Sequence, residues 1–274
     1  MSGPIYEVAP RRGGIVGVNF AELWAYRDLA WLLALRDIRL RYRQTLFGIA
    51  WALLQPLAAT LVFYFIFGRT VGLSGDTLPY GVFALSGVAL WGYFASGMEA
   101  AATSLVDDRE LLTRVWFPRL LAPLGAVVPG LLDLGVALVA LAVLMAVEGV
   151  APGLALMTLP LCLFFTALLA LGVGSLLCAV NIKYRDVKHT LPFALQLWFF
   201  ATPIVFASSL VHGTGRWLLA ANPVCGLVDW WRWAVVQAPA PPHEDLLSVV
   251  TGVVLVVVGL LYFRRVEGRF ADVV

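Results

Sequence analysis

Charged residues are scarce in this sequence. Of its 274 residues, 13% are charged and 61% are hydrophobic, whereas a soluble domain carries about 25% charged residues. The charges that are present form short clusters between long uncharged runs, which is typical of a protein that crosses a membrane several times. The net charge of +2 is too small to indicate a nucleic-acid partner. The composition therefore predicts an all-α integral membrane protein surrounded by membrane lipids.

Lysine and cysteine are also rare. Lys183 and Lys188 are the only lysines, and neither follows a glycine, so the chain has no phosphate-binding loop of the pattern GxxxxGK[ST]. The three cysteines, Cys162, Cys178 and Cys225, are scattered through apolar sequence, which predicts packing residues without a disulfide framework or a metal site. We expect no cofactor on this chain, and a transport function would need an energy source on another chain.

Six apolar runs can cross about 30 Å of hydrocarbon as helices, which takes about 20 residues each. The predicted spans are residues 44–68, 77–98, 120–147, the later part of 149–182, 190–206 and 246–263. Pro152 and Pro160 shift the start of the fourth span into the later part of its run, because proline favours a loop or a helix start. The sequence thus predicts a six-span transmembrane domain over residues 44–263.

The basic residues are unevenly distributed over these six spans. Of the 19 lysines and arginines, only Arg69, Arg216 and Arg232 would lie on one side of the membrane. The positive-inside rule places the other, basic side in the cytoplasm. We therefore expect both termini to be cytoplasmic, with an N-terminal region over residues 1–43 and a tail over residues 264–274.

Residues 208–245 separate the fifth and sixth spans and contain no run long enough to cross. The apolar stretch 217–228 is short, and Asn222-Pro223 interrupts it. Irregular backbone at membrane depth is tolerated only against protein or a water-filled cavity. We expect one or two short re-entrant helices that enter the outer leaflet and return.

The N-terminal region contains a predicted amphipathic helix. Phe20, Trp24, Trp31 and Leu35 recur at helical spacing among charged residues. This pattern is typical of a helix that lies in the membrane interface with its tryptophans at headgroup depth.

Four arginines follow this stripe: Arg36, Arg39, Arg41 and Arg43. One interpretation is simple anchoring to anionic lipid headgroups. The other is a basic entrance for a phosphorylated lipid substrate, because the planar guanidinium binds phosphate oxygens in pairs. Gly48 would let the chain turn closely beside that entrance.

Residues 107–118 predict a short cytoplasmic helix, with Asp107 as its N-cap and Pro118 limiting its length. Glu110 stands three residues after the cap, and the apolar side consists of Leu111, Leu112, Val115 and Trp116. Such a helix either lies on the membrane or docks into a groove of a cytoplasmic partner. We favour docking.

Asp133 is the one clear ionisable residue inside a predicted span. An acidic residue within the membrane is a candidate for function. A structural hydrogen bond to a neighbouring helix is the alternative interpretation.

Several motifs together resemble one family. They are residues 41–51 continuing to Pro56, residues 110–119, residues 181–187, and Asn222-Pro223 with Arg232 downstream. In this order they are similar to the permeases of type-2 ABC exporters, which move undecaprenyl-linked polysaccharides such as O-antigen, capsule-like glycans and teichoic acid. Phe47 stands where the family usually has leucine, which is a conservative departure.

The resemblance implies a permease of the bacterial cytoplasmic (inner) membrane that forms a homodimeric channel above two copies of an ABC ATPase, which would bind ATP and Mg. It also implies that residues 110–118 are the coupling helix and that residues 36–48 flank the entrance for the lipid diphosphate. Residues 208–245 would be the re-entrant helices at the outer exit.

Aromatic residues are consistent with a glycan substrate, because sugar rings present C–H faces that stack on aromatic rings. The candidate channel-lining residues are Trp51, Phe63, Tyr64 and Phe67 in the first span, and Trp198, Phe199 and Phe200 in the fifth. Ordinary packing and interfacial belts are the alternative explanation for each ring.

Two other functions are compatible with parts of the sequence. One is a permease for a drug or a lipid. The other is an intramembrane glycosyltransferase or hydrolase, but the first outer loop offers only Asp76, and His189, His212 and His243 have no evident nucleophile partner.

Overall fold

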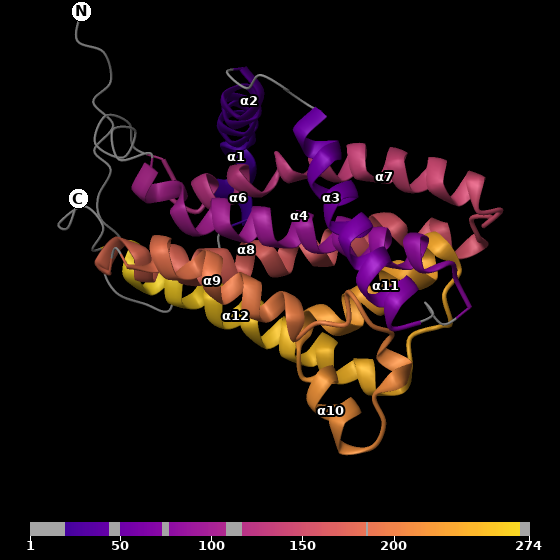
Figure 1. The fold of residues 1–274 in the computed structure, drawn as a ribbon. Helices are drawn as coiled ribbons and strands as arrows, with labels where there is room; N and C mark the ends of the chain where they lie inside the picture. Colours follow the sequence, from indigo (N-terminus) through magenta and orange to yellow (C-terminus); the bar gives the residue numbers. More distant parts are fainter. Residues whose placement is uncertain (1–19, 44–49, 73–76, 108–116, 185, 269–274) are drawn as a thin grey trace, which may run out of the picture.

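The computed structural model describes residues 20–43, 50–72, 77–107, 117–184 and 186–268. This part of the chain consists of helices joined by loops, as predicted (Figure 1). The α-helices are α1 (Phe20–Ala25), α2 (Arg27–Arg43), α3 (Ala50–Phe63), α4 (Tyr80–Asp107), α6 (Leu121–Val127), α7 (Gly130–Val147), α8 (Leu159–Lys183), α9 (Val187–Phe200), α10 (Thr214–Ala220), α11 (Pro223–Val236) and α12 (Leu246–Glu267). The shorter helical segments are η1 (Tyr64–Thr70), η2 (Leu154–Thr158), η3 (Ser208–Leu210) and η4 (His243–Asp245).

Five helical segments of the described chain are long and apolar enough to cross a membrane. They are Ala50–Thr70, Tyr80–Asp107, Leu121–Val147, Ala155–Lys183 and His243–Glu267, which correspond to the first, second, third, fourth and sixth predicted spans. The predicted fifth span begins as α9, which has 14 residues. At 1.5 Å per residue such a helix is about 21 Å long, shorter than the hydrocarbon core of about 30 Å. A sixth crossing stays a prediction.

The central helix of the bundle is α4, which packs against α3, α6, α7, α8 and α11. Small residues allow α8 to approach it closely. A Cβ atom at Gly174 would lie 2.5 Å from the Cβ of Ala101 and 3.0 Å from the carbonyl oxygen of Met98. On the other side of α8, a Cβ atom at Gly172 would lie 2.6 Å from the Cα of Val256 in α12. Close backbone contact of this kind is how membrane helices gain packing energy where lipid is as apolar as the side chains.

The predicted N-terminal amphipathic segment is helical and forms α1 and α2. In Figure 1, α2 runs across the direction of α4, α7 and α8. The side that contacts the bundle differs from the predicted stripe. Leu33 and Ala34 are buried against α6, where Gly125 leaves room for them, whereas Trp24 and Trp31 are exposed by 70% and 58%. These two tryptophans are available to contact lipid, and the interfacial position of the helix stays a prediction.

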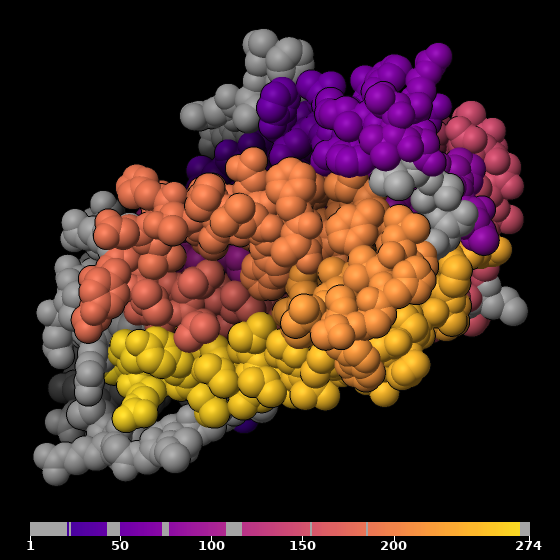
Figure 2. Space-filling view, turned by 60° about the horizontal axis from the view of Figure 1, so that its bottom comes forward, coloured from indigo at the N-terminus to yellow at the C-terminus, as the bar shows by residue number. Residues whose placement is uncertain are grey.

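Two short helices, α10 and α11, occupy most of residues 208–245, as the sequence predicts, and their position relative to a membrane stays a prediction. Asn222 caps α11 by accepting a hydrogen bond of 3.0 Å from the backbone N–H of Val224, and Pro223 follows in the first turn, where its missing N–H does no harm. Both helices contact α12. Figure 2 shows this face of the molecule, with α9 and the α10–α11 region (orange) between α3 (purple) and α12 (yellow).

Candidate functional site

The predicted intramembrane acid contacts one of the predicted phosphate-binding arginines. Asp133 lies in the first turn of α7, and its Oδ2 atom is 2.5 Å from Nη1 of Arg41 in α2. Tyr42 donates its hydroxyl proton to the other carboxylate oxygen. Both oxygens of Asp133 are thus bound by the end of α2, so the hydrogen bond to a neighbouring helix that the sequence allowed is present. A further role of Asp133 in transport stays a prediction.

Tyr42 is suited to act as a permanent donor at this junction. Burial, the hydrogen bond to Asp133 and the charge of that carboxylate raise the pKa of Tyr42 to about 12, while the charge of Arg41 acts in the opposite direction. The phenol is therefore protonated at physiological pH and can hold the carboxylate continuously. We call the contact of Arg41, Tyr42 and Asp133 the α2–α7 junction.

The other arginines of α2 lie in different surroundings. Arg36 donates from Nε and Nη2 to Oδ1 of Asp37 at 2.9 and 2.8 Å. Arg39 is exposed, and among the described residues no hydrogen bond or ion pair holds its guanidinium. Both line a shallow groove of about 220 Å³ whose remaining wall is Leu32, Leu35 and Leu40. A groove with apolar walls and two guanidinium groups fits a lipid with an anionic headgroup.

Two members of the predicted entrance are not described. The side chain of Arg43 and all of Gly48 lie outside the described residues. The α2 groove is therefore defined by Arg36 and Arg39, with Arg41 engaged at the α2–α7 junction.

The seven predicted channel-lining aromatics divide into two sets. Phe63, Phe67, Trp198 and Phe199 are partly buried and pack against the core. The rings of Phe63 and Phe199 stack at 5.7 Å, which joins α3 to α9. The exposed set consists of Trp51, Tyr64 and Phe200, at 56%, 44% and 58%. A partly buried ring offers little surface to a sugar, so the channel-lining prediction applies best to the exposed set.

Trp198 also connects α9 to α11. Its indole N–H donates to Oδ1 of Asn222 at 2.9 Å, and the ring meets Phe94 edge-on at 5.2 Å. The amide of Asn222 donates in turn to the hydroxyl of Thr202 at 2.8 Å. Asn222, which the sequence marked as a break in an apolar stretch and as part of a motif, therefore fixes the end of α9 to the start of α11.

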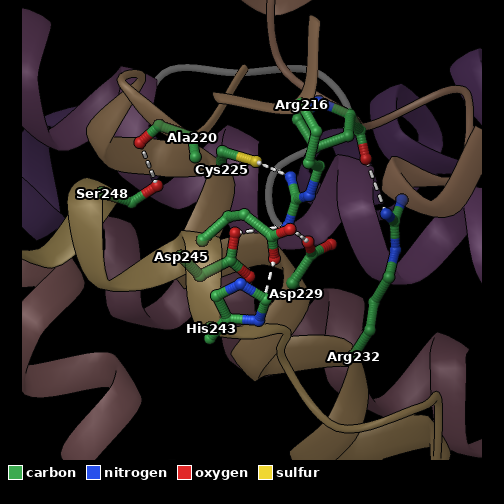
Figure 3. Close-up of polar contacts among 10 residues, drawn as sticks. Arg216, Ala220, Cys225, Asp229, Arg232, His243, Asp245 and Ser248 are labelled. Atoms are coloured by element: carbon green, nitrogen blue, oxygen red, sulfur yellow. Dashed lines mark hydrogen bonds and ion pairs between the residues drawn. The ribbon is translucent and has the colours of Figure 1, made fainter. Parts of the chain in front are cut away.

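A buried ion cluster was missed by the sequence reasoning. Arg216 of α10 donates from Nη2 to Asp229 of α11 at 3.2 Å and to Asp245 at the start of α12, and from Nη1 to the sulfur of Cys225 at 3.3 Å (Figure 3). Burial acts against its charge, while Cys225 and the two carboxylates favour it, and the net effect raises the pKa of Arg216. The available signal was three charged residues within an apolar stretch, Arg216, Asp229 and Arg232.

The same cluster contains a possible set of metal ligands. The ligand atoms of Cys225, Asp229 and Asp245 lie within 4.8 Å of one another. The guanidinium of Arg216 contacts all three, so a cation would have to displace a positive charge that already satisfies them. The arrangement fits an ion cluster that holds α10, α11 and α12 together better than it fits a metal site.

Arg232 fixes the turn that follows α9. It is 2% exposed, and it donates to the carbonyl oxygens of Pro203 and Ile204 at 2.6 and 2.7 Å. Its guanidinium carbon lies 3.6 Å from the ring centroid of Phe83, and Gly87 leaves the space that it fills. The chain after α9 therefore stays buried without a helix because a side chain from α11 binds its backbone carbonyls.

The predicted coupling residues Glu110, Leu111, Leu112, Val115 and Trp116 lie outside the described residues. The residues that flank them are described. Asp107, at the end of α4, pairs with Lys188 of α9 at 3.0 Å, and Arg119 donates to the carbonyl oxygen of Glu267 at the end of α12. These contacts bring the end of α4, the start of α9 and the end of α12 to one end of the molecule, while the side of the membrane on which this end lies stays a prediction.

The fold and these sites define a class of protein: a helical membrane protein with several spans, a crossing N-terminal helix rich in arginine, and two short helices that pack against α12 at the far end of the bundle. The chain belongs to the ABC-2 type transporter family, whose model matches residues 28–235.

Similar proteins cover nearly the whole chain. An O-antigen export system permease protein RfbA of Myxococcus xanthus is 28% identical over 254 residues, which is 92% of this chain and 97% of that protein. A protein of the same name from Klebsiella pneumoniae is 26% identical over 90% of this chain and 95% of its own length. The polysialic acid transport protein KpsM of Escherichia coli is 25% identical over 88% of this chain and 94% of its own length.

Proposed function

We propose that this chain is the permease subunit of an ATP-driven exporter that moves an undecaprenyl-diphosphate-linked polysaccharide across the bacterial inner membrane. The names of its relatives, an O-antigen export permease and a polysialic acid transport protein, support a glycan rather than a drug as the substrate. The matched relatives and this chain are similar over almost their full lengths, so the proposal extends to the whole permease.

The observation that carries the lipid-diphosphate part is the α2 groove. It combines an apolar wall for a lipid chain with Arg36 and Arg39 for an anionic headgroup. Arg41 points to the other side of α2, where Asp133 fixes it to α7. At about 100° per residue the groove lies on the face of α2 that is turned away from the bundle. A diphosphate held by the groove would therefore bind α2 without displacing the contact that joins this helix to the transmembrane bundle.

A homodimer with two copies of a separate ABC ATPase is the proposed assembly. The exposed aromatic residues Trp51, Tyr64 and Phe200 lie on α3, η1 and α9, which Figure 2 shows on one face of the molecule. A second copy that faced this surface would place two sets of exposed rings around a shared pathway. ATP and Mg would bind to the partner ATPase, which residues 110–118 would contact.

The direct test is purification of the permease with its neighbouring ATPase, reconstitution in lipid vesicles, and measurement of ATP hydrolysis. Lipid-linked glycan extracted from the producing strain should stimulate hydrolysis and should be carried into the lumen of inverted vesicles. Undecaprenyl phosphate without glycan, and a hydrophobic drug, are the comparison substrates. Equal stimulation by the drug would contradict the proposal.

The groove is tested by substitutions that keep its charge. Arg36→Lys with Arg39→Lys preserves two positive charges but removes the planar forks. Substrate-stimulated hydrolysis should fall about tenfold if one bidentate contact is lost, which corresponds to about 1.4 kcal/mol. Arg265→Lys, at an exposed position in the last turn of α12, is the matched control. Unchanged stimulation in the double variant would leave lipid anchoring as the sufficient explanation for these arginines.

A further inference from the structure

A cavity of about 600 Å³ lies beside α10 and α11. Part of its wall is polar and formed by short side chains, the hydroxyl-bearing Thr77, Ser208 and Ser209. Another part is formed by Phe83 and by the proline-rich segment 238–242. The volume is within the range of roughly 300–1,000 Å³ that is typical of small-molecule sites. We call it the exit cavity.

The charges of the cavity wall balance. Arg216 and Arg232 are cationic, and Asp229 and Glu244 are anionic; Figure 3 shows Arg216, Asp229 and Arg232 in this region. An anionic ligand would meet two carboxylates, and a cationic ligand would meet two guanidinium groups. A neutral ligand with many hydroxyl groups meets neither problem, because each hydroxyl both donates and accepts a hydrogen bond.

The apolar part of the wall has a complementary use. Phe83, Val211 and Pro239 present carbon surface next to the charged and hydroxyl groups. A sugar has the same two kinds of surface, since hydroxyl groups surround faces made of C–H bonds. The cavity therefore matches a carbohydrate in size, in charge and in its mixture of polar and apolar wall.

The cavity lies far from the basic end of the molecule. Helix α12 begins at Leu246, just after the wall residue Glu244, and ends at Glu267, whose carbonyl accepts from Arg119. Its 22 residues correspond to about 33 Å at 1.5 Å per residue. The cavity and the basic end are thus about one hydrocarbon thickness apart. If the basic end is cytoplasmic, the cavity faces the outside.

We propose that the exit cavity binds one or two sugar units of the exported glycan as they leave the permease. This inference rests on the proposed function and adds a glycan-binding site on the outer side of each protomer. A sugar that binds there reversibly delays the return of the chain into the pathway, so successive sugars that occupy the cavity would favour net outward movement. The wall would bind hydroxyl groups and C–H faces, which every sugar unit has. Each unit of the polymer can therefore occupy the cavity in turn as the chain moves outward.

The test measures the accessibility of a cysteine in the cavity wall. Ser208→Cys changes one atom in the wall, and His212→Cys, at an exposed position of the same loop outside the wall, is the matched control. The native cysteines are buried, so the unmodified permease gives the background. Spheroplasts with the full exporter are treated with a membrane-impermeant maleimide, once from a strain that makes the glycan and once from a strain that lacks its first glycosyltransferase.

The proposal predicts slower labelling of Ser208→Cys in the glycan-producing strain, by about twofold if the site is occupied half the time. Labelling of His212→Cys should be equal in the two strains. Equal labelling of Ser208→Cys in both strains would overturn the inference. Deletion of the permease gene separates this failure from failure of the proposed function: if the glycan still reaches the cell surface without the permease, the proposed function itself is wrong.

A second variant tests the site by filling it. Ser208→Trp should reduce glycan export several-fold at unchanged membrane abundance, and His212→Trp should not. Normal export by a Ser208→Trp permease that is present at the parental level would also overturn the inference. If Ser208→Trp is not present at that level, Ser208→Leu replaces it with the same expected direction.

Discussion

Arg41 and Asp133 are 92 residues apart in the sequence, and their side chains form an ion pair of 2.5 Å that joins α2 to α7. Tyr42 binds the second oxygen of the same carboxylate. An arginine predicted to meet a lipid diphosphate and an acid predicted to lie within the membrane are therefore partners. A phosphate group that bound Arg41 would have to compete with Asp133, and one that bound Arg36 would have to compete with Asp37, whereas Arg39 is exposed at the groove.

The strength of this pair can be measured by a double-mutant cycle with Arg41→Ala and Asp133→Ala. Both side chains are partly exposed, by 38% and 28%, so we expect a coupling free energy of about 0.5–1 kcal/mol. Thermal unfolding of the purified permease in detergent gives the stabilities of the four proteins. The same cycle with Arg39→Ala, which lies on the same helix without contacting Asp133, should give a coupling near zero. Equal coupling in the two cycles would contradict the geometry.

Arg216 should be essential for stability. Arg216→Ala leaves the buried carboxylates of Asp229 and Asp245 without their shared cation, and loss of one partner from a buried ion pair costs about 3–5 kcal/mol. Arg216→Ala combined with Asp245→Asn should recover part of the loss, because one uncompensated charge is removed. Thermal unfolding is again the measurement, with the exposed Arg69→Ala as the control. A melting temperature of Arg216→Ala equal to that of the parent would show that the cluster is not an important contact.

The close approach of α8 and α12 should depend on glycine. A Cβ atom at Gly259 would collide with the carbonyl oxygen of Gly172, so Gly259→Ala must separate the two helices and lower the melting temperature. A Cβ atom at Gly92 in α4 would have no atom within 4 Å. At an exposed helix position, alanine is more favourable than glycine by up to about 1 kcal/mol. Gly92→Ala should therefore be neutral or stabilising. The prediction fails if both variants unfold at the parental temperature.

Topology can be checked by labelling single cysteines from outside intact cells. His212→Cys should react with an impermeant reagent, and Asp186→Cys should react only after permeabilisation, because the positive-inside rule places the basic end in the cytoplasm. Gly213 is a poor labelling site, since its φ of 63° disfavours other residues. Labelling of Asp186→Cys in intact cells would reverse the proposed orientation.

Docking of residues 110–118 is tested by Leu112→Asp together with Trp116→Asp. Two charges on the predicted apolar side should prevent insertion into a groove of the ATPase, so the ATPase should no longer co-purify and export should stop, at normal permease abundance. His189→Asp, at an exposed position in the first turn of α9, is the control. Normal co-purification and export by the double variant would exclude the docking helix.

The spans could be predicted from sequence because their signal is local. A helix of about 20 uncharged residues satisfies its own backbone hydrogen bonds and buries apolar side chains wherever its neighbours lie. Four of the predicted spans therefore match helices that are long enough to cross, and so does the later part of residues 149–182. The predicted fifth span is the exception. Helix α9 ends at Phe200, shortly before Pro203, which cannot continue a helix, and the buried carbonyls of Pro203 and Ile204 bind Arg232 instead of a helical N–H.

The polar contacts of the candidate sites could not be predicted in the same way. The sequence marked Arg41 and Asp133 separately, and it marked Arg232 only as part of a motif, because nothing local indicates which distant group will satisfy a charge. The partner of Asp133 is decided by how α2 crosses α7, and that of Arg216 by how α10, α11 and α12 meet. The sequence by itself determined the membrane class, the apolar helices and the basic face. Only the tertiary structure decided which buried charges compensate one another. An unpaired buried charge destabilises the fold, and the packing of the helices determines which opposite charge lies close enough to pair with it.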